Sequence, residues 1–137
     1  MFSDNNIYLR LRVRVKLLDR ATLLLESGLG IKSPSSTERA GIIKFYEIAF
    51  QLSWRCIKDY LEIKGLNPKL PTEIIRLAVK HEVIDQADIL NSALNDRYLL
   101  EHIYDEDSAR SLEESIRNEY YPLLKDVCSF MCKVDFG

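Results

Sequence analysis

Arg97, His102 and Tyr104 are the residues of this sequence whose types and spacing are best suited to chemistry. A histidine imidazole exchanges protons near neutral pH, so His102 could act as a proton donor or acceptor. If this segment is one regular helix, Arg97 and His102 are five residues apart and point roughly 140° away from each other. A break in the helix, or a second copy of the chain, would be needed to bring these two side chains together.

The same three side chains also have a plain structural interpretation. Arg97 could form an ion pair with Glu101 one helical turn later, which would contribute only about 0.3 kcal/mol. His102 could be a polar surface residue, and Tyr104 could be an aromatic side chain that covers the end of the helix. Spacing alone leaves both interpretations open.

Other common catalytic and metal-binding patterns are missing from the sequence. It contains neither a G-x-x-x-x-G-K phosphate loop nor a G-x-S-x-G nucleophile motif. His81 follows Lys80 near a predicted helix end, and we expect it at the surface. Cys56, Cys128 and Cys132 include no C-x-x-C pair and make a poor zinc set, so we expect small buried thiols and neither a metal nor another cofactor.

Length and composition predict one soluble, mostly helical domain. The 137 residues are 47% hydrophobic and 29% charged, and five Gly and four Pro are few for a turn-rich β fold. No apolar run approaches the roughly 20 residues of a membrane-spanning helix. The first residues lack the basic flank and apolar stretch of a signal peptide, so we expect a cytoplasmic protein that does not bind membranes.

The formal net charge of −2 conceals an asymmetry along the chain. Residues 85–119 contain ten acidic residues against three arginines, whereas the first third is basic through Arg10, Arg12, Arg14, Lys16 and Arg20. The basic run is either a solvated helix face, which we favour, or the electrostatic footprint of a nucleic-acid site.

Apolar periodicity predicts five amphipathic helices. Residues 9–16 alternate like a half-buried strand, but helical spacing follows and no partner strand exists elsewhere, so we expect a helix over about 7–27. Further helical patterns cover about 39–63, a short stretch from Thr72, about 86–103, and a last helix that follows the acidic run 105–107 and that Pro122 should kink.

Local signals fix the expected ends of these helices. Gly28, Gly30 and Gly65 are expected stops, and Thr37 and Asp85 are expected N-caps. Short links between amphipathic helices predict an all-α, antiparallel up-down bundle with a four-helix core plus a short extra helix, formed as a single domain over residues 1–137.

Several ordered blocks of the sequence resemble the nucleotidyltransferase substrate-binding proteins. The run from Arg39 to Glu47 with the following Trp54-Arg55 is similar to their R-x-x-x-I-x-x-F-E-x-x-x-E-x-x-W-K signature. Asp96-Arg97 and His102-Ile-Tyr104-Asp105 are similar to their D-R-N-x-x-x-H-x-Y-[DN] block. With further blocks at 58–65, 71–76 and 83–85, the resemblance covers roughly residues 37–131.

This resemblance implies a member of the wider HEPN group of all-helical, usually dimeric domains encoded beside a minimal nucleotidyltransferase. In toxin–antitoxin members the R-x4-H motif is a metal-independent ribonuclease site, which the partner silences by attaching adenylyl groups to the tyrosine of R-x4-H-x-Y. Carried over to this chain, Arg97 and His102 would be catalytic, Tyr104 would be the adenylylated residue, and the supporting pocket would contain Asp96, Tyr98, Glu47 and Trp54.

These implied roles agree with the chemistry of the side chains. An imidazole can move a proton between a ribose 2′-hydroxyl and a leaving oxygen at neutral pH. A guanidinium can hold the scissile phosphate with two parallel hydrogen bonds and stabilise the charge that develops. A phenol next to that site can accept a nucleotidyl group, whose phosphate would then compete for the same arginine.

The sequence departs from the family pattern in three ways. Tyr98 stands where Asn is usual, Leu100-Glu101 replaces a small polar pair, and Gln51 stands where Glu is usual. Acidic residues also crowd the motif and repel an RNA backbone. The R-x4-H-x-Y motif of this chain is therefore degenerate.

The resemblance and the pattern together lead to one functional prediction and one alternative. We predict a toxin-like module that works with a separate minimal nucleotidyltransferase and takes RNA or a nucleotide, but not DNA, as its candidate ligand. We also predict a homodimer, because the apolar arc of the 39–63 helix is wider than one partner helix would cover, with Trp54 near the centre of the interface. The alternative is a non-catalytic nucleotide- or substrate-binding or adaptor bundle.

Overall fold

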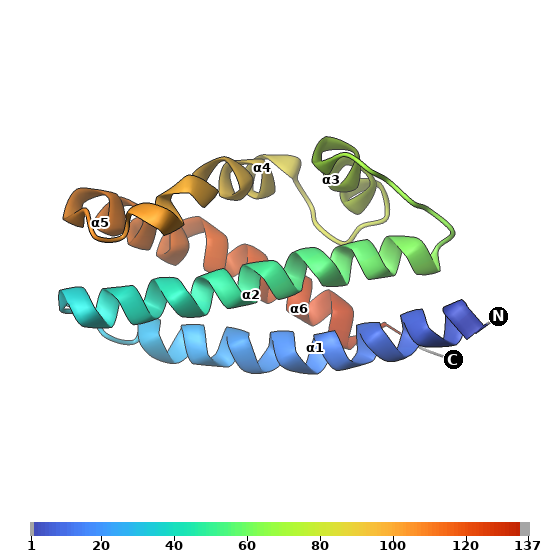
Figure 1. Cartoon of the computed structure of the whole chain (residues 1–137), viewed down its shortest axis with the longest axis horizontal. Coiled ribbons are helices and arrows are strands. Elements are labelled where there is room, and N and C mark those ends of the chain that lie inside the picture. Colours follow the sequence, from blue (N-terminus) through green and yellow to red (C-terminus); the bar gives the residue numbers. More distant parts are fainter. Residues whose placement is uncertain (1, 135–137) are drawn as a thin grey trace.

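The computed structural model describes residues 2–134, and within this range every regular element is a helix (Figure 1). The predicted all-α class is therefore confirmed. In chain order the elements are α1 (Phe2–Leu29), α2 (Ser36–Ile63), α3 (Pro71–Lys80), α4 (Ala87–Asn95), the 3₁₀ helix η1 (Asp96–His102), α5 (Glu106–Ser115), the π-helical turn η2 (Ile116–Tyr120) and α6 (Tyr121–Cys132).

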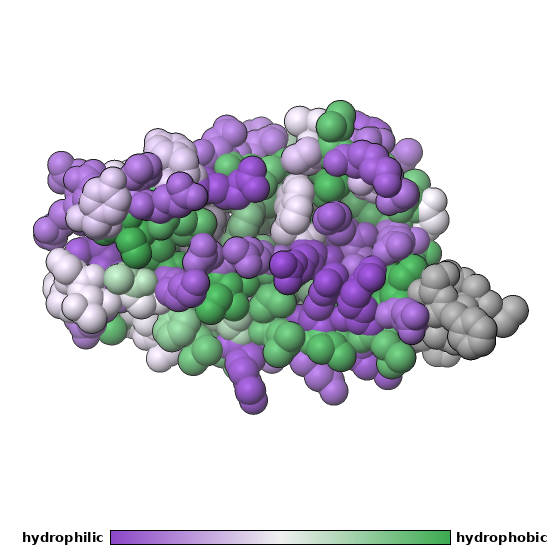
Figure 2. Space-filling view, in the orientation of Figure 1, coloured by the Kyte–Doolittle hydropathy of each residue, from purple (hydrophilic) through white to green (hydrophobic). Residues whose placement is uncertain are grey.

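A long hairpin of α1 and α2 forms one side of the bundle (Figure 1). α1 is a helix, as its second half indicates, and it buries Leu11, Val15, Leu18 and Leu25. The first half of α1 alternates apolar and polar residues like a strand. On a helix, this spacing places the other apolar residues on the side of α1 that faces away from the core. That outer face exposes Leu9, Val13, Leu17 and Leu24, and Figure 2 shows it as a green band along α1.

The rest of the chain covers the other sides of α2. The continuous run of α5, η2 and α6 packs on α1 and α2, while α3 also contacts α2 (Figure 1). Tyr46, Phe50 and Ile57 of α2 are buried in one core with Leu112 and Ile116. The predicted helical bundle is confirmed, and the wide apolar arc of α2, from which we inferred a dimer, is covered largely within the chain.

Helix ends follow the predicted signals with three exceptions, the first of which is Gly28, because it lies inside α1 and does not end it. α1 ends at Leu29 beside Gly30, and α2 ends before Gly65, whose φ of +83° is a conformation that favours glycine. The cap of α2 is Ser35 in a capping box with Glu38 rather than Thr37. Gln86 rather than Asp85 occupies the N-cap position of α4, and its side chain makes no cap hydrogen bond.

Two helices of the sequence prediction are interrupted. The helix predicted over 86–103 is wrong in its second half, because α4 ends at Asn95 and the chain continues as 3₁₀ helix η1. The last helix, in which we expected a kink at Pro122, contains a π turn over Ile116–Tyr120 just before that proline. Among the described residues, none of the helices combines the length and apolarity needed to cross a lipid bilayer.

Candidate functional site

The 3₁₀ helix η1 presents Arg97 and His102 of the R-x4-H-x-Y motif at the surface, and Tyr104 lies in the turn that follows it. On a 3₁₀ helix with about three residues per turn, five positions still separate two side chains by roughly 120°. Arg97 and His102 accordingly have different neighbours. The break in the helix alone does not create an Arg97–His102 pair.

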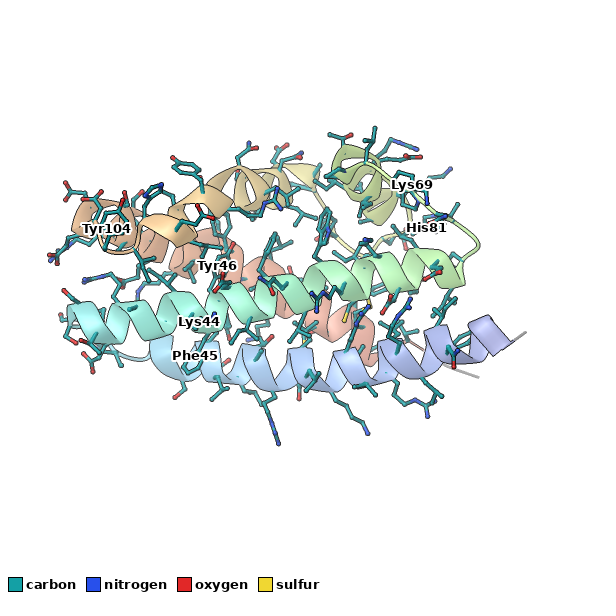
Figure 3. All side chains as sticks on the ribbon, viewed as in Figure 1. Lys44, Phe45, Tyr46, Lys69, His81 and Tyr104 are labelled. Carbon is teal, nitrogen blue, oxygen red and sulfur yellow. The ribbon has the colours of Figure 1, made fainter. Side chains whose placement is uncertain are left out.

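His102 belongs to an exposed aromatic cluster with Tyr98 and Tyr104. The Tyr104 hydroxyl oxygen lies 2.9 Å from His102 Nδ1, and the ring of Tyr98 meets the imidazole edge-on at 6.3 Å between centroids. Tyr104 is 81% exposed in the turn between η1 and α5, at one end of the bundle (Figure 3). When Nδ1 carries no proton, the phenol can donate its hydroxyl hydrogen to the imidazole.

Arg97 lies on the other side of η1, against α2. Its Nε donates to the carbonyl oxygen of Leu94 at 3.2 Å, and the ion pairs of the described residues do not include one with Glu101. Arg97, Glu47 and Trp54 line one pocket of about 240 Å³ between α2 and η1. The structure thus brings together three of the residues predicted for the site and separates them from the His102 cluster.

Asp96 anchors η1 and does not line this pocket. Its carboxylate accepts a hydrogen bond of 2.5 Å from the Tyr120 hydroxyl, and the Tyr120 ring stacks on Tyr46 with 5.7 Å between centroids. Burial, then the contact with Asp96, raises the pKa of Tyr120 above its ordinary value. Burial likewise raises the pKa of Tyr46. Both phenols therefore stay protonated at neutral pH and act as hydrogen-bonding and stacking groups.

A buried ion network that sequence reasoning did not find holds α5 against the α1–α2 connection. Arg39 Nε and Arg117 Nε each donate to Glu113 at 2.7 Å, while Arg117 also donates to the carbonyl oxygens of Leu29 and Ile31. Burial raises the pKa of Glu113, but hydrogen bonds from Arg117 and Arg39 outweigh it and lower the pKa overall. The available sequence signals were Arg39 and Glu113, each a charged residue on the apolar side of its helix.

A second unforeseen ion cluster joins α1 to α2. Asp59 is 2% exposed and accepts hydrogen bonds from Arg10 Nε and Nη2 at 3.1 and 2.8 Å and from Arg14 Nη1 at 2.8 Å. Arg10 is still 43% exposed and agrees with the expected solvated face, whereas Arg14 is half-buried; both arginines are ion-paired with Asp59. A carboxylate among buried apolar positions of α2 was the available signal, because a buried charge requires a partner.

The remaining candidates from the sequence lie outside this region. His81 is half-buried at the end of α3 and lies at the opposite end of the molecule from Tyr104 in Figure 3. Cys56 and Cys128 are buried as expected, and burial raises the pKa of each thiol to about 12. Cys132 is exposed, so the expectation of a buried thiol is wrong there: it lies in the last turn of α6 and lines an open pocket between α6 and α1.

Most of the chain matches the model of a known protein family. The family described as nucleotidyltransferase substrate binding protein like matches residues 13–133. This chain is a member of that family. The match of the nucleotidyltransferase substrate-binding family begins at residue 13, within α1. The motif blocks recognised in the sequence begin only at about residue 37. No curated protein matches the chain.

Solved structures agree with this membership. A Thermus thermophilus protein is 27% identical, with a TM-score of 0.75, over 83% of this chain and 98% of its own. A Haemophilus influenzae protein described as the substrate-binding domain of a nucleotidyltransferase is 20% identical, with a TM-score of 0.80, over 87% of this chain and 99% of its own. The second similarity shows that the two proteins share a fold.

Proposed function

We propose that this member of the nucleotidyltransferase substrate-binding family works with a separate minimal nucleotidyltransferase, and that Tyr104 is the residue to which the partner transfers a nucleotidyl group. One observation carries the proposal: Tyr104 is 81% exposed and its hydroxyl oxygen lies 2.9 Å from His102 Nδ1. Another enzyme can reach this phenol, and a proton acceptor is in hydrogen-bond contact with it. Membership of the nucleotidyltransferase substrate-binding family supports a nucleotidyltransferase as the partner.

The chemistry of the transfer can be written with the groups present. The phenol oxygen of Tyr104 attacks the α-phosphorus of a nucleoside triphosphate, and the new O–P bond forms as the bond to pyrophosphate breaks. Pyrophosphate leaves, and the phenolic proton passes to His102 Nδ1. The partner supplies the nucleotide and the groups that hold its phosphates, while this chain supplies the nucleophile and the base.

The experiment compares Tyr104→Phe with Tyr98→Phe. Each variant is co-expressed with a minimal nucleotidyltransferase, the partner proposed here, and the intact mass of the purified protein is measured with and without it. We expect wild type and Tyr98→Phe to gain whole adenylyl increments and Tyr104→Phe to gain none. Tyr98 is the matched control because it is 61% exposed and belongs to the same aromatic cluster.

Two results would contradict this function. Modification of Tyr104→Phe at the wild-type level would place the acceptor elsewhere. Failure of the two proteins to associate in a pull-down, with no mass increment in wild type, would favour the adaptor bundle without a ligand.

A ribonuclease role for Arg97 and His102 is the second candidate, and it requires a second copy of the chain. Within one chain Arg97 faces the Trp54 pocket while His102 contacts Tyr104. Both side chains are accessible from outside the chain, so a second chain of a homodimer could place its Arg97 beside this His102. We propose such a composite site as the form in which the degenerate motif would cleave RNA without a metal ion.

A further inference from the structure

A second pocket, separate from the Tyr104 cluster, lies where α1 meets the C-terminal half of α2. It has a volume of about 360 Å³, and its cationic lining consists of Arg10, Arg14, Arg55 and Lys58. The loop that follows α2 adds a wall through Leu66 and Pro68. We call this site the cationic pocket. Figure 2 shows a continuous hydrophilic area over this part of α2 and the adjacent α1.

The buried carboxylate of Asp59 holds two of the four cations, Arg10 and Arg14, in place. Asp59 binds both Nε and Nη2 of Arg10, and it binds Nη1 of Arg14 through its second oxygen. Arg10 Nη2 also donates to Glu62 at 2.8 Å. Because a guanidinium has five N–H donors, these contacts fix both arginines and still leave donors that can face a ligand in the pocket.

The other two cations lack a compensating acid. Among the ion pairs of the described residues, none includes Arg55 or Lys58. Glu62 and Asp59 are the carboxylates that line the pocket, and both contact Arg10. Four positive and two negative side chains leave a formal excess of two positive charges in this one open pocket.

We propose that the cationic pocket binds the polyphosphate chain of a nucleoside polyphosphate. Arginines held by a carboxylate present paired N–H groups that match phosphate oxygens, and a lysine adds a compact charge. The volume is in the range of small-molecule sites. The cations converge on one pocket rather than forming a track along a groove, so the arrangement fits a short anion better than a strand of RNA.

The site is distinct from the one proposed for Tyr104. Arg55 is the residue that lines both the cationic pocket and the Trp54 pocket, so the two are adjacent along α2. Neither His102 nor Tyr104 lines the cationic pocket. Nucleotide binding is measured on this chain alone, so the result does not depend on whether a partner enzyme modifies Tyr104.

The test is calorimetric titration of the full chain with ATP, inorganic pyrophosphate and adenosine. We expect ATP and pyrophosphate to bind saturably, one per chain, and adenosine not to bind, because the phosphates provide the contacts. The double variant Arg55→Ala/Lys58→Ala leaves the Asp59 cluster intact and should weaken ATP binding by about tenfold or more, because two charged contacts are lost.

The control is Arg76→Ala/Lys80→Ala, which removes the same two charges from exposed positions of α3. It should change ATP affinity by no more than about twofold, since long-range interactions at the surface are screened by salt. Thermal unfolding by circular dichroism checks that both variants are folded. Equal weakening in the two variants, or no saturable ATP binding at millimolar concentration, would overturn the proposal.

A single-stranded oligoribonucleotide without a 5′ phosphate forms the last arm of the titration. It should bind more weakly than ATP and should not displace it. An oligonucleotide that binds more tightly than ATP, and that loses affinity in Arg55→Ala/Lys58→Ala but not in the control, would overturn the nucleotide assignment in favour of RNA.

Discussion

At the scale of single residues, the contact between His102 and Tyr104 determines what this surface can do. A phenol alone is a weak nucleophile at neutral pH, and an imidazole within hydrogen-bond reach can accept its proton as it reacts. The two residues are separated by one position in the chain and meet in the exposed turn after η1. The contact between His102 and Tyr104 therefore depends on local chain geometry more than on packing in the core.

His102→Ala should slow modification of Tyr104 by the partner by about a hundredfold, because the proton acceptor is lost. The free energy of unfolding should change by no more than about 0.5 kcal/mol, because His102 is exposed. The measurements are the rate of mass gain with purified partner and nucleotide, and urea unfolding of both proteins. A rate equal to that of wild type would exclude His102 as the base.

At the scale of elements, buried ion clusters position the helices relative to one another. The Arg39–Glu113–Arg117 network joins α5 and η2 to the start of α2 and to the α1–α2 connection. Asp96 and Tyr120 join η1 to the end of η2. The orientation of the motif-bearing segment thus depends on contacts between residues far apart in the sequence.

Glu113→Gln should lower the free energy of unfolding by about 3 kcal/mol at pH 7, because it leaves two arginine side chains without their shared carboxylate. The folded-state pKa of Glu113 lies below its unfolded value. Its stabilising contribution is therefore complete above the unfolded pKa, near 4.3, and is lost as the pH falls through the lower folded value. Urea unfolding at pH 7 and at pH 3 measures this difference.

Glu114→Gln is the matched control for this prediction, since Glu114 is the exposed neighbour on the same helix. It should change the free energy of unfolding by no more than about 0.5 kcal/mol at either pH. A Glu113→Gln variant as stable as this control at pH 7 would show that the network does not stabilise the fold.

At the scale of the whole molecule, the ribonuclease candidate depends on the assembly of two chains. A twofold dimer would contain two composite sites, each with Arg97 from one chain and His102 from the other. Such a site predicts that two inactive variants restore activity when they are mixed. A site within one chain predicts that they do not.

Equal amounts of Arg97→Ala and His102→Ala chains, unfolded together and refolded, should recover about a quarter of wild-type cleavage. Half of the dimers are then mixed and each has one intact site. Each variant alone should be inactive, and Arg97→Lys should not restore cleavage, because an ammonium lacks the planar fork. The measurement is RNA cleavage with EDTA present, alongside sedimentation equilibrium at micromolar concentration.

Three outcomes would contradict the composite site. A monomer in sedimentation would remove the dimer on which it depends. Cleavage that requires a metal ion would point to a different mechanism. Activity of His102→Ala alone would exclude the proposed proton transfer.

The sequence by itself determined the helical class and the bundle, because these follow from local periodicity and short links. Ile42, Tyr46, Ala49 and Phe50 recur at helical spacing, and all are buried in α2. Gly65 marked the end of α2 because few other residues adopt its positive φ. The ordered motif blocks identified the family before any contact was known, and the family match over residues 13–133 agrees.

Only the tertiary structure decided how the candidate residues are grouped. α4 ends at Asn95, and Asp96 of the 3₁₀ segment that follows bonds to Tyr120, a residue 24 positions later. Asp59 meets Arg10 across 49 positions, so periodicity along one helix could not reveal the cationic pocket. Local sequence patterns determine which face of a helix is apolar, but the packing of distant helices determines which polar groups meet.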